Sequence, residues 1–276
     1  MEAYRPYEIM RRGSTTFFNS SLFFPRDLRS DVMALYAFVR TADDFVDRMP
    51  QDRDGFLAFR NDYLAAEKGR ATDYPVIRGF LELSGRCGFD PKWTHEFLNA
   101  MEQDLWKKDY ATLEETEAYM RGSAESVGLM MARIMKLPDD SLPYARLLGK
   151  AFQYLNFIRD IREDLDLGRV YIPRQEIEAA GLPELTLTTA VEYPESFAAL
   201  VGRQLELYRM WREEASEGFK FIPRRYLVAI RTAADVFDTT AAQIEASPNV
   251  VLKRKVRPSK ARVLLAGVRN LIGPPA

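Results

Sequence analysis

The sequence predicts an all-α protein that forms a single domain over residues 1–276. Apolar residues recur with helical spacing, stretches of alternating polarity are nearly absent, and no repeat or long linker divides the chain. The run 169–173 comes nearest to a strand, and the loosest segment, 173–194, is expected to be a connection inside the domain. Hydrophobic residues make up 47% of the chain, enough for a sizeable core, so we expect one bundle of roughly eight to ten helices.

Eight segments carry the helical pattern. In the first of them Leu28, Val32 and Leu35 repeat at intervals of three and four residues. A capping box at residues 112–115 begins the fourth helix, and Gly168 ends the fifth. The predicted helices span residues 26–47, 54–68, 91–108, 112–135, 141–167, 195–217, 223–246 and 259–271.

Charge and composition exclude several classes of protein. The chain has 39 basic and 40 acidic residues, a balance that argues against a nucleic-acid partner. With one cysteine, Cys87, and one histidine, His95, neither an intrachain disulfide nor a common zinc site can form, so carboxylates would have to hold any metal. Apolar runs are shorter than the ~18 residues of a membrane span, and the N-terminus lacks the apolar region of a signal peptide. We therefore expect a cytoplasmic protein that is at most peripheral on a membrane.

A first acidic motif lies at the end of the predicted helix 26–47. Asp43 and Asp47 are four residues apart, so their side chains project from one face, and Arg40 lies on the same face. The macrodipole disfavours carboxylates at a helix C-terminus, and a bound cation would relieve that cost. A solvated acidic turn is the alternative for this motif taken alone.

A second acidic motif repeats the spacing within the predicted helix 141–167. Asp160 and Asp164 lie one turn apart, and Asn156 precedes them by one turn. A surface helix with mixed charges is the alternative in isolation. Two such motifs in one helical chain favour a site where carboxylate-bound Mg²⁺ clamps a diphosphate and promotes breakage of a C–O bond. The chain also has 17 Phe, 13 Tyr and 3 Trp; most belong to a core, but an aromatic cavity suits an isoprenoid chain and its carbocation.

The motifs, in this order and spacing, resemble those of the squalene/phytoene synthase family, the head-to-head prenyl transferases. The resemblance begins at about Ser14 and is strongest at residues 14–17, 36–47, 156–164 and 168–173. It implies an isoprenoid-synthase helical bundle with a central cavity. It also implies Mg²⁺, or Mn²⁺ in its place, bound by aspartates at the mouth of that cavity.

The resemblance assigns roles to individual residues. It implies that four aspartates bind metal and act in catalysis together with Tyr171: Asp43, Asp47, Asp160 and Asp164. The substrate-binding residues that it implies are Arg40, Asn156, Arg159, Arg169, Phe17, Ser21, Met33 and Tyr119. The segment 122–128, with glycine at both ends, matches a kinked helix that lines the cavity, although tight helix packing would also explain the glycines. Gly13 stands where some members have histidine, which leaves no imidazole there.

The reaction implied by the resemblance joins two geranylgeranyl diphosphates head to head. A cyclopropylcarbinyl diphosphate would form and then rearrange to phytoene, with release of diphosphate and no need for NADPH. Ser21 and Met33 stand where a C30-forming relative has aromatic residues, so we expect room for the longer chain. The alternative is a C30 enzyme that uses farnesyl diphosphate to make squalene, diapophytoene or presqualene diphosphate. The four aspartates disfavour a non-catalytic assembly factor, and the 169–173 run disfavours a terpene cyclase or chain-elongating enzyme.

The C-terminal stretch is basic. It carries seven lysines and arginines after Glu245 and no further acidic residue. Such a stretch could contact anionic lipid, into which a hydrocarbon product has to pass. A solvated surface or help with diphosphate binding are the alternatives. The sequence does not indicate an oligomeric state.

Overall fold

The computed structural model describes residues 5–272, and within them the fold is built from helices. This part of the chain contains sixteen α-helices, one π-helix and two 3-10 helices, and its only β contact is an isolated bridge between Asp109 and Val170. The predicted all-α class is confirmed. The first eight α-helices are α1 Pro6–Gly13, α2 Thr15–Ser21, α3 Arg26–Asp47, α4 Arg53–Glu67, α5 Pro75–Cys87, α6 Pro91–Gln103, α7 Leu113–Met120 and α8 Ser126–Ile134. The others are α9 Leu142–Arg159, α10 Ile161–Asp166, α11 Arg174–Ala179, α12 Leu187–Glu192, α13 Pro194–Ser216, α14 Arg224–Ala246, α15 Val250–Lys253 and α16 Lys260–Ile272.

The longest helices agree with the sequence prediction, and most of its errors concern shorter ones. The bounds of α3 are those predicted, those of α13 differ by one residue at each end, and those of α14 differ by one residue at the start. The expected count of eight to ten was too low because α11, α12 and α15, with four to six residues each, are too short to show a helical period. The helices α1, α2 and α5 were also missed. The predicted connection 173–194 contains α11 and α12, and the predicted helix 141–167 is broken at Asp160.

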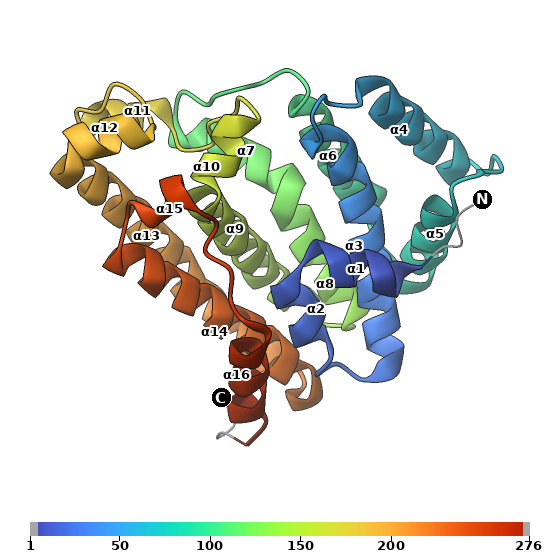
Figure 1. The fold of residues 1–276 in the computed structure, drawn as a ribbon. Helices are drawn as coiled ribbons and strands as arrows, with labels where there is room; N and C mark the ends of the chain where they lie inside the picture. Colours follow the sequence, from blue (N-terminus) through green and yellow to red (C-terminus); the bar gives the residue numbers. More distant parts are fainter. Residues whose placement is uncertain (1–4, 273–276) are drawn as a thin grey trace.

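The interior is organised around α9. Figure 1 shows α9 near the middle of the molecule, with α13 and α14 on one side and α3, α6 and α8 on the other. A large hydrophobic core packs these helices together, and a second, small cluster of Phe219, Leu227 and Ala234 lies beside α14. Within the large core the rings of Phe38 and Phe80 stack with centroids 3.9 Å apart, which packs α3 against α5. The packing of these helices brings the C-terminal ends of α3 and α9, where the two acidic motifs lie, to the same cavity.

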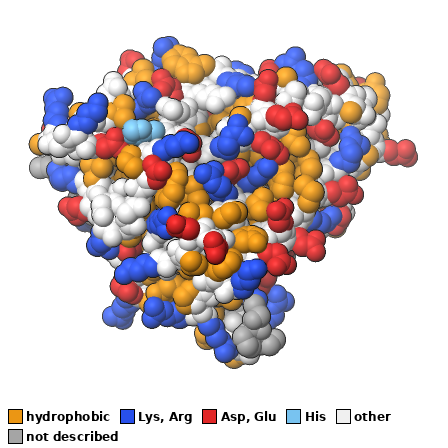
Figure 2. All heavy atoms as spheres, turned by 180° about the vertical axis from the view of Figure 1, so that it is seen from behind, with side chains coloured by type: hydrophobic (Ala, Val, Ile, Leu, Met, Phe, Trp, Pro, Cys, Tyr) orange, Lys and Arg blue, Asp and Glu red, His pale blue; other side chains and the backbone are white. Residues whose placement is uncertain are grey.

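The outer surface carries charge of both signs. Figure 2 shows lysine and arginine interspersed with aspartate and glutamate over the face seen from behind, with hydrophobic side chains between them. Among the described residues, none of the helices is both long enough and apolar enough to cross a membrane.

The predicted kink lies between α7 and α8 and is a π-helix, Arg121–Glu125. Gly122 within the π-helix and Gly128 in α8 both lie directly against neighbouring backbone. A Cβ atom on Gly122 would collide with the Glu96 carbonyl of α6, and one on Gly128 with the Ala145 carbonyl of α9. The kink and the tight packing, which the sequence left as alternatives, are therefore both present. Close backbone approach fixes α8 against α9, the two helices that wall the cavity described below.

We expect Gly128→Val to destabilise the protein, because the new side chain meets a backbone carbonyl that cannot rotate away. The cost should be about 1–3 kcal/mol, measured by urea unfolding. Gly202 of α13 is the matched control, since a Cβ atom there meets nothing within 4 Å. Gly202→Ala should leave stability unchanged or raise it by about 0.5–1 kcal/mol. Equal effects of the two substitutions would contradict the close approach of α8 and α9.

Candidate active site

Two adjoining cavities open in the middle of the helical assembly. One has a volume of about 770 Å³ and is lined by charged and polar side chains, among them all four aspartates of the two motifs. The other has a volume of about 280 Å³ and an almost wholly apolar wall. Both are lined by Phe17, Tyr36, Val39, Ser123, Gln153 and Asn156. We call them the polar cavity and the apolar cavity; the shared residues mark where a charged group and an apolar chain of one ligand would meet.

The first acidic motif reaches the polar cavity from the last turns of α3. Asp43 and Asp47 line this cavity, whereas Asp44 does not. Arg40 bridges the neighbours, with its guanidinium 2.8 Å from Asp43 and 2.6 Å from Asp44. Burial, together with the charge of Asp47, raises the pKa of Asp43 well above its usual range. Arg40 therefore compensates only part of the negative charge at the end of α3.

The second acidic motif lies where α9 gives way to α10. The helix is interrupted at Asp160, so Asp164 belongs to a separate short helix. Arg159 donates to Asp160 at 2.7 Å, and the Lys255 ammonium lies 3.1 Å from the same carboxylate. Burial and the charges of Asp160 and Asp47 raise the pKa of Asp164 well above its usual range. Asp47, Asp160 and Asp164 all line the polar cavity, so the two motifs border the same space.

Arg169 ties the two motifs together. Its buried guanidinium lies 2.8 Å from Asp47 and donates to the Val46 carbonyl at 2.5 Å. The parallel bridge between Asp109 and Val170 holds the chain in place beside it. The Nε atom of Arg169 is buried without a partner in the described residues. All three arginines predicted to bind diphosphate thus border the polar cavity and already pair with aspartates of the motifs.

Asp104 is a site residue that the sequence analysis missed. It lies at the end of α6, fully buried, and accepts hydrogen bonds from Tyr119 at 2.6 Å and from Tyr171 at 2.8 Å. Burial raises its pKa to about 6. The ring of Phe157 stacks on Tyr171 with centroids 4.2 Å apart and fixes that tyrosine. The predicted site residues Tyr119 and Tyr171 therefore share one buried carboxylate.

A signal for Asp104 was present in the sequence. The residue follows Met101 by three positions and Phe97 by seven, so it falls on the apolar stripe of the predicted helix 91–108. A carboxylate on a buried face requires hydrogen-bond partners, and such a residue is a candidate for a functional site.

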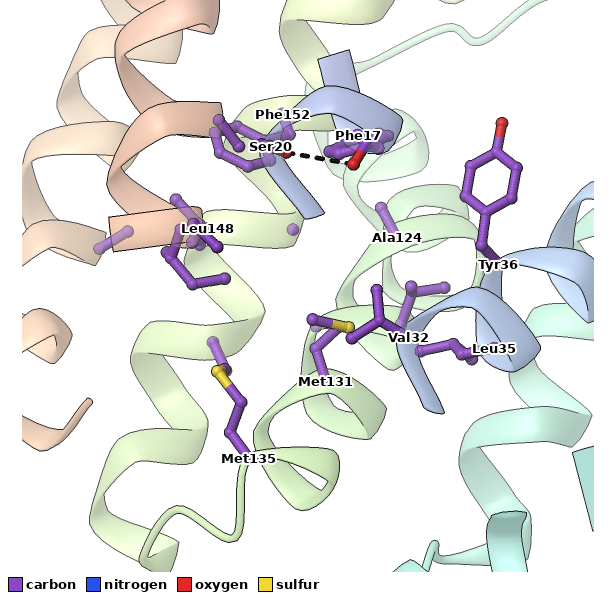
Figure 3. Close-up of a pocket in the computed structure, with 18 of the residues that line it drawn as sticks. Phe17, Ser20, Val32, Leu35, Tyr36, Ala124, Met131, Met135, Leu148 and Phe152 are labelled. Carbon is purple, nitrogen blue, oxygen red and sulfur yellow. Dashed lines mark hydrogen bonds between the residues drawn. The ribbon is translucent and has the colours of Figure 1, made fainter. Parts of the chain in front are cut away.

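The apolar cavity is formed by side chains from helices far apart in the sequence. Figure 3 shows Phe17 and Ser20 of α2, Val32 and Leu35 of α3, and Met131 of α8 around it. Phe152 of α9 closes another side, and its ring stacks on Phe237 of α14 at 4.1 Å. The wall therefore consists of aromatic and aliphatic surface, as an isoprenoid chain requires.

Of the two residues predicted to line the apolar cavity, Ser21 does so and Met33 does not. Ser21 lies in the wall of the apolar cavity, 2% exposed, with its hydroxyl donating to the Phe18 carbonyl at 2.7 Å. Met33 is buried in the core and lines neither cavity, so its predicted position in the wall is wrong. The reason is helical geometry: the lining face of α3 carries Val32, Leu35, Tyr36 and Val39, at intervals of three and four, and Met33 is turned about 100° from the first of these.

The residues of the polar cavity suit a hard divalent cation that arrives with a phosphorylated ligand. Among residues 5–272 no three acidic side chains group closely enough to hold an ion by themselves. Mg²⁺ is commonly bound through one or two carboxylates together with substrate phosphates and waters. The raised pKa values of Asp43 and Asp164 reflect carboxylate charge that such a cation would neutralise.

We expect Asp104→Asn to lower the free energy of unfolding by about 1–3 kcal/mol in urea titrations. Two hydroxyl donors converge on this carboxylate, and an amide offers only one accepting oxygen. Asp109→Asn is the control: Asp109 is exposed and pairs with Arg174 at the surface, so its loss should cost less than about 1 kcal/mol. Unchanged stability of the Asp104 variant would show that the tyrosines do not depend on this carboxylate.

Comparison with known proteins agrees with the site. Residues 10–262 match the family model described as squalene/phytoene synthase. A 15-cis-phytoene synthase from Paracoccus sp. is 29% identical over 95% of this chain and 88% of its own, and one from Enterobacter agglomerans is 31% identical over 83% of this chain and 81% of its own.

Solved structures share the fold. A dehydrosqualene synthase in complex with ligand has a TM-score of 0.82 and 24% identity, covering 96% of this chain and 93% of that one. A squalene synthase from Alicyclobacillus acidocaldarius has a TM-score of 0.73 and 24% identity, covering 87% of this chain and 92% of that one. The chain thus belongs to the squalene/phytoene synthase family and is an enzyme of the prenyl transferase type.

Proposed function

We propose that this enzyme condenses two molecules of geranylgeranyl diphosphate head to head to form phytoene. The observation that carries the proposal is the junction of the two cavities, where a polar chamber bordered by two acidic motifs opens onto an apolar one. A prenyl diphosphate has the same two parts, an anionic head and a long apolar chain. The phytoene synthases among the relatives support the C40 product.

The diphosphate groups would occupy the polar cavity. Asp43, Asp47, Asp160 and Asp164 would hold Mg²⁺, or Mn²⁺ in its place, which when bound supplies positive charge that stabilises the leaving diphosphate. Arg40, Arg159 and Arg169 orient the phosphate oxygens, since a guanidinium matches them in geometry and charge. Asn156, which lines both cavities, would fix the first carbon of the prenyl chain relative to its phosphate.

The reaction needs two ionisations and two proton losses. In the first, a C–O bond breaks with its electron pair leaving on diphosphate, and the allylic cation adds to a double bond of the second substrate. Loss of a proton closes the cyclopropane ring. In the second, the cyclopropylcarbinyl diphosphate loses its diphosphate, the cation rearranges, and a further proton leaves to give phytoene. No reductant is consumed on this route, and the aromatic wall contributed by Phe17, Phe152 and Tyr36 excludes water from the cations.

We propose two further properties of the enzyme. The large hydrophobic core supports a single domain over residues 1–276. We also propose that the enzyme is cytoplasmic and associates peripherally with a membrane, because the proposed hydrocarbon product has to enter lipid. The near-equal numbers of basic and acidic residues are unsuited to a nucleic-acid partner.

Asp43→Asn and Asp160→Asn should each reduce turnover with Mg²⁺ by roughly 10²-fold or more, because each variant loses a charged ligand of the cation. Helical content should stay unchanged in circular dichroism. Asp44→Asn is the matched control: it alters the neighbouring aspartate, whose side chain is 57% exposed and lies outside the polar cavity. Near-normal turnover of either cavity variant would remove that residue from the metal site.

Ser21→Phe should abolish the C40 product and retain or increase the use of farnesyl diphosphate, because a ring in the wall shortens the apolar cavity. Product mass after incubation with each diphosphate, with and without NADPH, measures this. Leu22→Phe, at a partly exposed neighbour, is the control and should leave the product unchanged. If the unmodified enzyme makes only a C30 product, the substrate is farnesyl diphosphate and the chain-length proposal is wrong.

A further inference from the structure

The last described helix, α16, has two apolar faces. One is buried: Val263 and Gly267 lie against the body of the protein, and a Cβ atom on Gly267 would collide with the ring of Phe23. Arg269 and Asn270 bind Asp235 of α14 at 3.0 Å and 2.7 Å, which fixes the rotation of the helix. The other face carries large hydrophobic side chains that contact solvent: Leu264, Leu265, Val268, Leu271 and Ile272.

The exposed residues form one continuous stripe. Their spacing of one, three, three and one places them on a single side of a helix, within about 120° of arc. Leu265 is 71% exposed and Ile272 79%. Isolated exposed leucines are common on soluble proteins, but a clustered stripe along one helix marks a surface that binds an apolar partner.

Positive charge borders the stripe. Lys260 lies along one edge, and Arg262 and Arg269 lie along the other, all three exposed. The sequence after Glu245 contains no acidic residue that would repel an anionic surface. A helix with an apolar face rimmed by lysine and arginine has the composition of one that lies in the interface of an anionic bilayer.

The structure also divides the basic C-terminal stretch in two. Lys255 turns inward and contacts Asp160 at 3.1 Å and Glu163 at 2.5 Å, and Arg257 approaches Glu163 at 3.8 Å. These two side chains border the polar cavity and compensate its acidic groups. The cations of α16 remain at the outer surface. Lys253 and Arg254 are exposed as well, so what distinguishes α16 within the basic stretch is its apolar stripe together with its cations.

α16 lies against the walls of the apolar cavity. Figure 1 shows it packed along α14, and it also contacts α2. The apolar cavity is bounded by Ser20 and Ser21 of α2 and by Ala229, Ile230 and Ala233 of α14. A bilayer that covered α16 would thus adjoin the two helices between which an apolar product is held.

We propose that the exposed face of α16 docks the protein on an anionic lipid bilayer, with the leucines inserted among the acyl chains and the flanking cations at the headgroups. The inference rests on the proposed function only in that an apolar product has to enter lipid. Lipid binding is measured without substrate or metal, so its failure would leave the condensation proposal standing, and the reverse also holds.

Flotation with vesicles of phosphatidylglycerol and phosphatidylcholine tests the proposal. The unmodified protein should float with these vesicles at low salt, and Leu265→Glu should weaken binding roughly tenfold or more, since a charge replaces an inserted side chain. Lys260→Gln combined with Arg262→Gln should weaken binding to anionic but not to neutral vesicles. Met210→Glu is the control: Met210 is 53% exposed on α13, away from the stripe, and its substitution should leave binding unchanged.

Thermal melting and turnover of detergent-dispersed substrate should be the same for Leu265→Glu and the unmodified protein, because Leu265 touches neither cavity. The proposal is overturned if the unmodified protein stays unbound or if Leu265→Glu floats equally well. It is also overturned if light scattering without vesicles shows a dimer that Leu265→Glu dissociates, because the stripe would then bind a second copy of this chain.

Discussion

Carboxylates from separate parts of the chain repel one another across the polar cavity, and the surrounding structure is arranged to hold them there. Asp47 adds to this repulsion on both sides, because its charge raises the pKa of Asp43 in its own motif and that of Asp164 in the other. Asp43 and Asp47 also lie at the C-terminal end of α3, where the helix dipole adds to the cost. Arginine and lysine side chains from α3, α9, the chain after α10 and the chain after α15 offset part of it. Because the compensation is only partial, a bound cation would further reduce the repulsion among these carboxylates.

Close backbone packing supplies the rigidity that this arrangement needs. Gly122 and Gly128 bring the kinked helix against α6 and α9, and Gly149 of α9 meets the Ala124 carbonyl in return. A larger residue at Gly122 would push the kinked helix away from α6, and one at Gly128 or Gly149 would push it away from α9, the helix that carries Asn156 and leads into the second acidic motif. The same close approach aligns the polar and apolar cavities, because Ser123 and Ala124 of the π-helix contribute to the wall between α3 and α9. Precise charge placement and the shape of the apolar wall therefore depend on one set of glycines.

The sequence predicts the long helices of this fold and most of the charged residues that line the polar cavity. Long helices such as α3 and α14 show many apolar repeats, so their bounds were predicted closely. Asp43, Asp47, Asp160 and Asp164 were found because their spacing is local. Asp104 was missed because its role depends on tyrosines 15 and 67 residues away in the chain. Met33 was expected in the wall because it corresponds to a lining residue of a relative, and that correspondence failed because this residue of α3 faces the core instead.

The C-terminal segment connects the polar cavity to the exposed apolar stripe of α16. Residues 254–259 connect α15 to α16, and within them Lys255 spans Asp160 and Glu163 while Val256 is buried in the core. The segment that compensates acidic charge at the polar cavity is thus the same one that leads into α16 and its exposed leucines. The α16 end of this connection is held in place, since Gly267 lies against Phe23 and Arg269 is bound to Asp235. Lys255 and α16 are thus held by separate contacts, the ion pairs with Asp160 and Glu163 at one end of the connection and the packing against α2 and α14 at the other.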